Sequence, residues 1–177
     1  VVSSGPDSDW ESIMQVYFYL ISNARKSICI TSPYFFPNES ILTAFITASL
    51  SGTSVKIILP NRADSRLATW GSRSYFQQLL EANIDIYLYN NGFTHSKLLI
   101  IDDEIASAGT ANMDIRSFNQ NFEANIIIYD KTVVARLKED FENDLKNCIK
   151  LDYETFSDRP VRQKIAESTA RLFSPLM

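Results

Sequence analysis

Apolar side chains recur along this chain with two alternating patterns. Residues 9–25, 38–52, 64–81 and 134–148 carry them at three- and four-residue spacing, which predicts helices with one buried face. Between these segments lie short apolar and β-branched runs, typical of strands that are covered on both faces. The alternation predicts an α/β fold, a layered α/β/α sandwich with helices on both faces of a central sheet.

The ends of two helices carry recognisable signals. Ser8 and Glu11 have the spacing of a capping box at the start of the first helix, whose apolar positions begin with Trp10. Asn38 is an N-cap for the second helix, and Gly52 ends it. The elements are therefore expected to begin and end close to these residues.

The last segment, 159–177, is expected to form an amphipathic helix. Val161, Ile165, Leu172 and Phe173 fall on one side, with basic residues elsewhere. This side is predicted to pack on its own domain; the alternative is contact with a membrane surface.

Composition limits the class of protein. At 177 residues and 45% hydrophobic, the chain has the size of one domain over 1–177. The net charge of -4 argues against binding nucleic acid through bulk positive charge. Cys29 and Cys148 lie far apart in apolar segments, so core thiols are expected rather than a disulfide or a zinc site.

Targeting signals are not visible in the sequence. No apolar run approaches the roughly 20 residues needed to cross a bilayer, and no signal peptide opens the chain. Because the first residue is Val1, we expect a soluble fragment of a longer or processed protein.

His95 is the only histidine, and Lys97 lies two positions later. In a strand that begins near His95 the two side chains share a face, so an imidazole and an ammonium together suit phosphate chemistry. Downstream, residues 109–112 offer a tight turn with backbone N–H groups and polar side chains. Glu123 is placed to accept a hydrogen bond from the imidazole. The alternative interpretation is a surface histidine, a solvated lysine and an ordinary turn.

The spacing of the whole set favours the chemical interpretation. The pattern His95-x-Lys97-x4-Asp102-x6-Gly109-x2-Asn112 resembles the HKD motif of the phospholipase D superfamily. The surrounding stretches "GTANMDIRSF", "TSPYFFP" and "LPNRADS" resemble the C-terminal half of bacterial cardiolipin synthases. The resemblance covers nearly the whole chain and implies a phospholipase D-like fold with a mixed sheet.

The resemblance also implies a mechanism without metal or cofactor. Two such motifs face each other; one histidine attacks phosphorus to form a phosphohistidine, and the other protonates the leaving alcohol. On this basis His95 is nucleophile or acid/base, and Lys97 and Asn112 hold the phosphate. Thr110 lies beside the phosphate and Glu123 orients the histidine. The motif residues Asp102 and Gly109 are expected to be structural.

A single motif cannot supply both histidines. The expected partner is the N-terminal half of the same protein or a second copy of this chain, acting on the anionic lipid phosphatidylglycerol at the bacterial inner membrane. The implied reaction converts two phosphatidylglycerol molecules to cardiolipin and glycerol. The alternatives are a homodimeric phosphodiesterase and a non-catalytic pairing half. The sequence pI of about 5.0 makes nucleic acid an unlikely substrate.

Three further groups of residues have open roles. Tyr34, Phe35 and Phe36 either line an acyl or glycerol pocket or pack against the sheet. Arg62, Arg66 and Arg73 either contact phosphate or form a solvated helix face. Arg116 and Ser117 are expected to contact a second phosphate or to brace the facing half.

Overall fold

A single eight-stranded sheet runs through the computed structural model, which describes residues 1–62 and 65–172. The strand order is β1-β9-β7-β6-β2-β4-β5-β10. β2, β4 and β5 pair in parallel, and the other neighbours in this sheet are antiparallel. The mixed sheet confirms the fold class. Its strands are β1 Val2–Ser4, β2 Ser27–Thr31, β4 Ser54–Pro60, β5 Asp85–Tyr89, β6 Leu98–Ile101, β7 Ile105–Gly109, β9 Glu123–Ile128 and β10 Cys148–Lys150.

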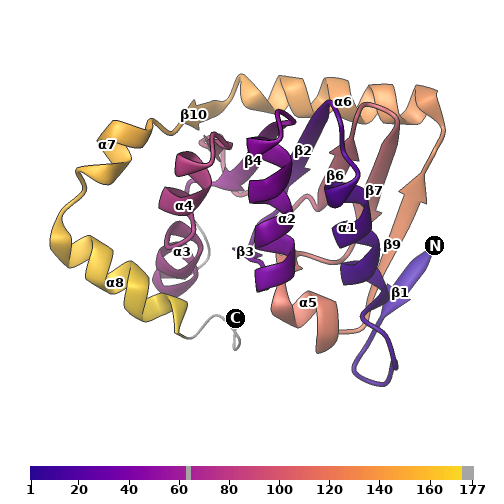
Figure 1. The fold of residues 1–177 in the computed structure, drawn as a ribbon, viewed down its shortest axis with the longest axis horizontal. Coiled ribbons are helices and arrows are strands. Elements are labelled where there is room, and N and C mark those ends of the chain that lie inside the picture. The colour runs from indigo at the N-terminus through magenta and orange to yellow at the C-terminus, as the bar shows by residue number, and fades with distance from the viewer. Residues whose placement is uncertain (63–64, 173–177) are drawn as a thin grey trace.

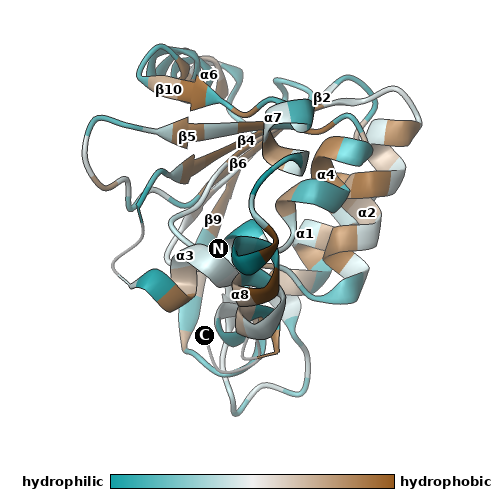
Figure 2. Ribbon diagram, turned by 90° about the vertical axis from the view of Figure 1, so that its left-hand side faces the viewer, coloured by the Kyte–Doolittle hydropathy of each residue, from teal (hydrophilic) through white to brown (hydrophobic). Residues whose placement is uncertain are grey.

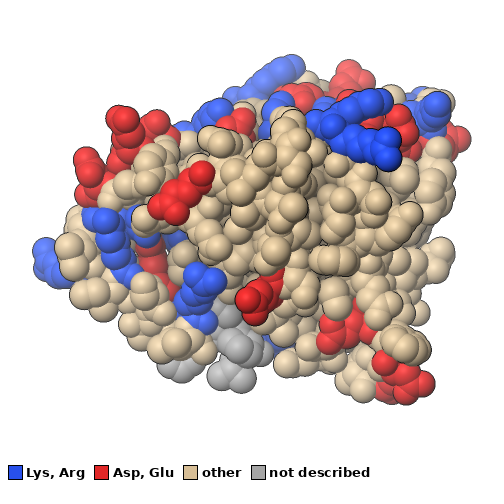
Figure 3. Space-filling view, viewed as in Figure 1, with Lys and Arg blue, Asp and Glu red and all other residues tan. Residues whose placement is uncertain are grey.

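Helices cover both faces of this sheet, as the sequence predicts (Figures 1 and 2). One face packs against α1, α2 and their neighbours in a large apolar core, whereas α6 covers the other face through Val134 and Phe141. Figure 3 shows charged side chains mainly around the rim of the first face. The helices are α1 Ser12–Ser22, α2 Glu39–Leu50, α3 Arg66–Arg73, α4 Phe76–Glu81, α5 Ile115–Asn119, α6 Lys131–Leu145, α7 Tyr153–Ser157 and α8 Val161–Arg171.

A small second sheet joins two loops at one edge of the domain. β3 (Phe35–Phe36) pairs in parallel with β8 (Met113–Asp114). The loop after β2 is thereby fixed to the loop after β7, although about 80 residues separate them in sequence.

Both predicted ends of the second helix are confirmed, and Gly52, with a φ of 98°, lies just past the end of α2. The predicted start of the first helix and the single helix over 64–81 are wrong. Asn38 caps α2, since its side chain accepts a hydrogen bond from the Ile41 N–H at 3.0 Å. The predicted capping box is wrong: α1 begins later, its N-cap Glu11 makes no side-chain capping bond, and Trp10 is 69% exposed. The predicted helix 64–81 is two helices, α3 and α4, separated at Ser74, whose hydroxyl donates to the Gly71 carbonyl at 2.6 Å.

Two predictions near the C-terminus also need correction. Cys148 begins β10 and does not belong to α6, although Cys29 is a buried free thiol as expected. The predicted buried side of the last helix is wrong. Val161 and Ile165 are exposed, while Glu167 is buried. Phe173 lies outside the described residues.

Candidate functional site

Several chain segments with polar residues meet at one edge of the sheet. β2, β4 and β5 end at this edge, and β6 begins there, because Thr31 pairs with Leu98 and Pro60 with Tyr89. Ligands of open α/β sheets bind at the carboxyl ends of such strands. Residues 90–97 and 110–112 therefore lie where a ligand is expected.

His95 and Lys97 lie in the irregular segment before β6, not in a strand as predicted. The two side chains nonetheless meet: Lys97 Nζ lies 3.3 Å from each imidazole nitrogen and donates to the His95 carbonyl oxygen at 2.9 Å. His95 is exposed, and its ring lies 5.9 Å from the ring of Phe93. The imidazole is therefore accessible to a ligand from outside the domain.

The Lys97 ammonium lies in a partly buried, anionic environment. Burial lowers the pKa of Lys97, and the nearby carboxylates Glu123 and Asp114 oppose that shift only in part. A lysine placed in this way can neutralise an incoming anion at low desolvation cost.

Strand β9 holds the turn that follows β7. Gly109 lies against β9 so closely that a Cβ would collide with the Ala124 carbonyl oxygen and with Asn125. The Thr110 hydroxyl accepts a hydrogen bond from the Ala124 N–H at 3.0 Å, and the Ala111 N–H donates to Asn125 Oδ1 at 3.2 Å. Glycine at 109 therefore lets the turn reach the site edge, and Thr110 also stabilises the β7–β9 ladder.

Asn112 belongs to a buried polar cluster. Its backbone N–H donates to Ser117 Oγ at 3.1 Å, and its side chain hydrogen-bonds Asp114. Burial raises the pKa of Asp114, and the bonds from Ser117 and Asn112 offset that increase in part. Within residues 1–62 and 65–172, Asn112 Oδ1 is buried and has no hydrogen-bond partner. Because Oδ1 is a hydrogen-bond acceptor, an unpaired oxygen at this buried position is where a donor group of a ligand is expected.

Ser117 and Arg116 have different positions. Ser117 is fully buried; its backbone N–H donates to Asp114 Oδ1 at 2.7 Å and its hydroxyl to Glu123 Oε1 at 3.4 Å. Ser117 therefore braces the loop from inside, and Arg116, which is exposed, is the member of the pair that can reach a ligand or a facing surface.

Glu123 does not contact His95 as the sequence suggested. Its carboxylate accepts hydrogen bonds from Ser117 and from Asn121 at 3.3 Å, and no hydrogen bond joins it to His95 in the part of the chain that the structure describes. The reason is the irregular path before β6, which carries the imidazole outward. Glu123 instead lies close enough to Lys97 to attract its ammonium.

Asp102 lies at the opposite end of β6 from His95. Its carboxylate accepts backbone N–H bonds from Arg25 at 3.0 Å, Lys26 at 2.7 Å and Ser27 at 2.9 Å. Burial alone would raise the pKa of Asp102, but these bonds outweigh it and lower the pKa. Asp102 thus ties the β6–β7 turn to the start of β2.

The aromatic loop after β2 is mainly part of the core. Phe35 and Phe36 are fully buried, so a pocket lined by these two rings is ruled out. Tyr34 is half-buried, and its carbonyl accepts a bond from Ser32 Oγ at 2.7 Å, which in turn accepts the Met113 N–H at 3.1 Å. Tyr34 therefore lies beside the loop that carries Asn112.

The three arginines predicted to form a basic segment separate in the structure. Arg73 pairs with Glu167 at 3.3 Å and contributes to the domain's own packing. Arg66 stacks over Trp70 at 5.2 Å on the surface of α3. Of the three, Arg62 and Arg66 are exposed, whereas Arg73 is partly buried.

Asn125 is a site residue that the sequence did not reveal. It is buried, its Nδ2 donates to Tyr17 Oη at 2.7 Å and to Ser107 Oγ at 3.1 Å, and its Oδ1 holds the turn at Ala111. The only signal in the sequence is an asparagine within an apolar strand.

The described residues contain neither a metal-binding cluster nor a membrane-spanning helix. Residues 1–62 and 65–172 contain no group of three or more His, Cys, Asp or Glu side chains that could hold a metal ion. Within the same ranges, none of the helices combines the length and the apolar character that crossing a membrane requires.

A protein-family model described as "Cardiolipin synthase, PLD-like domain" matches residues 17–145 of this chain. The chain belongs to this family. The match includes His95, Lys97, Asn112 and Glu123, and it confirms the resemblance seen in the sequence.

Curated relatives extend over the whole chain. It is 50% identical over all 177 residues to a cardiolipin synthase of Geobacillus sp. (strain WCH70), and 48% identical to the major cardiolipin synthase of Bacillus subtilis. The chain spans 35% and 37% of the length of these two relatives.

Solved structures share the fold at lower identity. Nuc from Salmonella typhimurium, a phospholipase D family member, aligns with a TM-score of 0.71 at 20% identity, over 85% of this chain and 99% of that one. The phosphatidylserine synthase of Haemophilus influenzae aligns with a TM-score of 0.75 at 18% identity, over 98% of this chain and 46% of that one. The same fold thus makes up nearly all of one neighbour and less than half of another.

Proposed function

We propose that this chain forms one half of a cardiolipin synthase active site, in which a phosphatidyl group passes from one phosphatidylglycerol to another. The observation that carries the proposal is the accessible His95 imidazole in contact with the Lys97 ammonium, at the ligand-binding edge of the sheet. The name of the relatives, which are about half identical to this chain, supports the choice of lipid.

The proposed chemistry divides the transfer into two displacements at phosphorus. In the first, an imidazole nitrogen attacks the phosphorus of phosphatidylglycerol, the bond from phosphorus to the glycerol oxygen breaks, and an acid donates a proton to the departing glycerol. In the second, a hydroxyl of another phosphatidylglycerol gives its proton to the group that acted as the acid in the first step. The hydroxyl oxygen attacks phosphorus, and the phosphorus–nitrogen bond breaks. The products are cardiolipin and glycerol.

The proposal gives each site residue a role. His95 is the nucleophile or the acid/base, while Lys97 and Asn112 hold the phosphate oxygens, with Thr110 at the rim. Glu123 acts through Lys97, because the structure places its charge near that ammonium. Arg116 and Tyr34 are proposed to contact the substrate beyond the phosphate.

A second histidine must come from outside this chain, which contains one. We propose that it belongs to the N-terminal half of the longer protein, which works at the cell membrane. The share of the relatives' length that this chain spans supports that partner. A second copy of the chain is the alternative, and the full coverage of Nuc is the observation that favours it.

The test is phosphatidyl transfer by the complete protein with His95→Ala, Lys97→Ala and Asn112→Ala in parallel. We expect His95→Ala to lower turnover by at least about 1,000-fold, because removing one member of a set of catalytic groups that act as a unit costs about as much as removing the whole set. Val133→Ala, an exposed change on α6, is the matched control. A radiolabelled phosphatidyl group that co-purifies with the wild-type protein after denaturation at mildly alkaline pH, and that acid then releases, would identify the covalent phosphorus–nitrogen intermediate.

Two outcomes would contradict the proposal. Unchanged turnover in His95→Ala would make this chain a non-catalytic pairing half. A stable dimer of the isolated chain in light scattering, with phosphodiesterase activity that needs no other half, would favour the homodimeric enzyme.

A further inference from the structure

Helix α8 is amphipathic, but its apolar side faces solvent and its polar side faces the domain. Val161, Ile165 and Leu172, four and seven residues apart, are 69%, 60% and 79% exposed. Residues at this spacing lie along one side of a helix, so they form an apolar strip, here called the α8 stripe, in which Ser168 separates Ile165 from Leu172. The opposite side, which contacts α3, carries Glu167 and Ala170, both buried.

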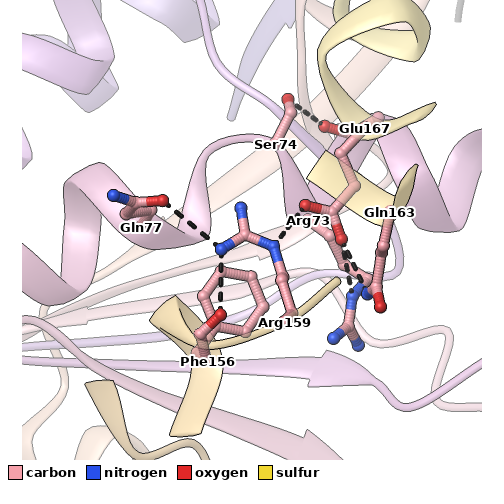
Figure 4. Close-up of polar contacts among 8 residues, drawn as sticks. Arg73, Ser74, Gln77, Phe156, Arg159, Gln163 and Glu167 are labelled. Carbon is pink, nitrogen blue, oxygen red and sulfur yellow. Dashed lines mark hydrogen bonds and ion pairs between the residues drawn. The ribbon is translucent and has the colours of Figure 1, made fainter. Parts of the chain in front are cut away.

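Charged groups, rather than apolar ones, hold this helix in place (Figure 4). Glu167 accepts bonds from Arg159 Nε at 2.7 Å, Gln163 Nε2 at 2.9 Å and Arg73 Nε at 3.3 Å. Arg159 also stacks on Phe156, 4.0 Å from the ring centre. Because polar contacts fix the inner face of α8, its orientation does not depend on the apolar stripe being buried.

The charge beside the stripe has one sign. Arg162 and Lys164 flank it on either side, and neither makes an ion pair within the part of the chain that the structure describes. Glu167, the only acidic residue of α8, is buried on the far side. Figure 3 shows Lys and Arg side chains over α8 at the lower left of the view, on a protein whose net charge is -4.

We propose that the α8 stripe lies on the surface of an anionic lipid bilayer. An apolar strip flanked by lysine and arginine is the pattern of helices that lie in the plane of a membrane interface. Three aliphatic side chains along roughly 17 Å of helix expose far less than the ~800 Å² that each partner of a stable protein interface contributes. A bilayer needs no such complementary area.

A hollow beside the stripe offers room for a headgroup. It lies between α3 and α8, and Trp70, Arg73 and Arg162 are among the residues that line it. Tryptophan and arginine are both frequent where protein meets the polar layer of a membrane. The stripe and this hollow lie side by side, because Arg162 flanks the stripe and also lines the hollow.

Vesicle binding by this chain tests the inference. Sedimentation with vesicles of equal parts phosphatidylglycerol and phosphatidylcholine, and with phosphatidylcholine alone, gives two partition coefficients. We expect Ile165→Asn to weaken binding to the anionic vesicles about tenfold, the loss from one buried aliphatic side chain. The matched control is Leu50→Asn, 65% exposed at the end of α2, which should bind as the wild type does.

A charge variant separates the electrostatic part. Arg162→Gln with Lys164→Gln should weaken binding to anionic vesicles about 30-fold and leave binding to phosphatidylcholine unchanged. Far-UV circular dichroism and thermal midpoints equal to wild type show that these outward changes leave the fold intact.

Two results would overturn the inference. Equal vesicle binding by Ile165→Asn and Leu50→Asn would show that the α8 stripe does not contact the bilayer. A dimer that Ile165→Asn dissociates in light scattering would assign the stripe to a second copy. His95→Ala is expected to bind vesicles as the wild type does, so loss of the proposed catalytic role and loss of the membrane contact can be distinguished.

Discussion

Helices α6 and α8 are held to the domain by opposite means. Apolar groups bury α6 against the sheet, and its ion pairs, such as Lys138 with Asp103 at 3.0 Å, lie at the surface. In α8 the ion pairs are buried, and the apolar stripe is outside. An amphipathic helix can therefore pack on its domain through either its apolar side or its polar side. Burial of apolar side chains stabilises a helix without specifying one packing geometry. A buried charge network specifies one geometry and leaves the apolar side of the helix exposed to solvent.

The largest effect is expected from the apolar anchor of α6. Phe141→Ala should lower the free energy of unfolding by about 4 kcal/mol, because a fully buried ring leaves a cavity. Urea denaturation followed by circular dichroism measures the loss. Val133→Ala, at a 41% exposed position of the same helix, should change stability by less than about 0.5 kcal/mol. Equal losses in the two variants would mean that α6 is not held by its buried face.

A smaller and more local effect is expected from the charged anchor of α8. Glu167→Ala leaves Arg73 and Arg159 without their carboxylate partner and should lower the free energy of unfolding by about 3 kcal/mol. This value is at the low end for a broken buried ion pair, because Arg73 remains partly solvated. Hydrogen exchange should speed up in α8 and remain unchanged in β4. Glu154→Ala, an exposed glutamate of α7, is the control. Uniform exchange across the whole chain would show that α8 is not a separate unit.

The smallest effect is expected at the surface ion pair of α6. Burial on its own would lower the pKa of Lys138, but hydrogen bonds to Asp103 and Cys29 and their charge raise it above 10.5. The stabilisation is therefore fully present below pH 10.5 and is lost as pH rises through the folded-state pKa. Lys138→Met should cost less than about 1 kcal/mol at neutral pH, and the difference from wild type should vanish in strong alkali. A difference that persists there would indicate lost packing rather than lost charge.

The sequence predicts much of this architecture because its elements follow local rules. The period of Val134 and Phe141 places the buried face of α6 correctly, and the spacing of His95, Lys97 and Asn112 locates the site edge. The same period gives the α8 stripe but cannot tell which side faces inward. That choice depends on Arg73, which lies on α3, 94 residues away from Glu167, and on Arg159, which lies in the segment between α7 and α8.

Other features depend on the path of the backbone, which periodicity does not describe. Glu123 and His95 were expected to meet, but the irregular segment before β6 turns the imidazole outward, and Glu123 bonds Ser117 and Asn121. Phe35 and Phe36 follow a proline and could have been exposed; pairing of β3 with β8 buries them. Both outcomes require long-range contacts that are known only once the sheet is assembled.

The position of Asp102 divides the sequence motif into two unlike parts. Roughly 13 Å of strand separates its carboxylate from the end of β6 that follows the histidine and lysine. Its partners are backbone amides of the turn before β2. In a living cell, a substitution at Asp102 is therefore expected to behave as a temperature-sensitive allele, with activity retained in the cold and protein lost on warming. A substitution at His95 is expected to give a full-length, well-folded protein that is inactive at every temperature.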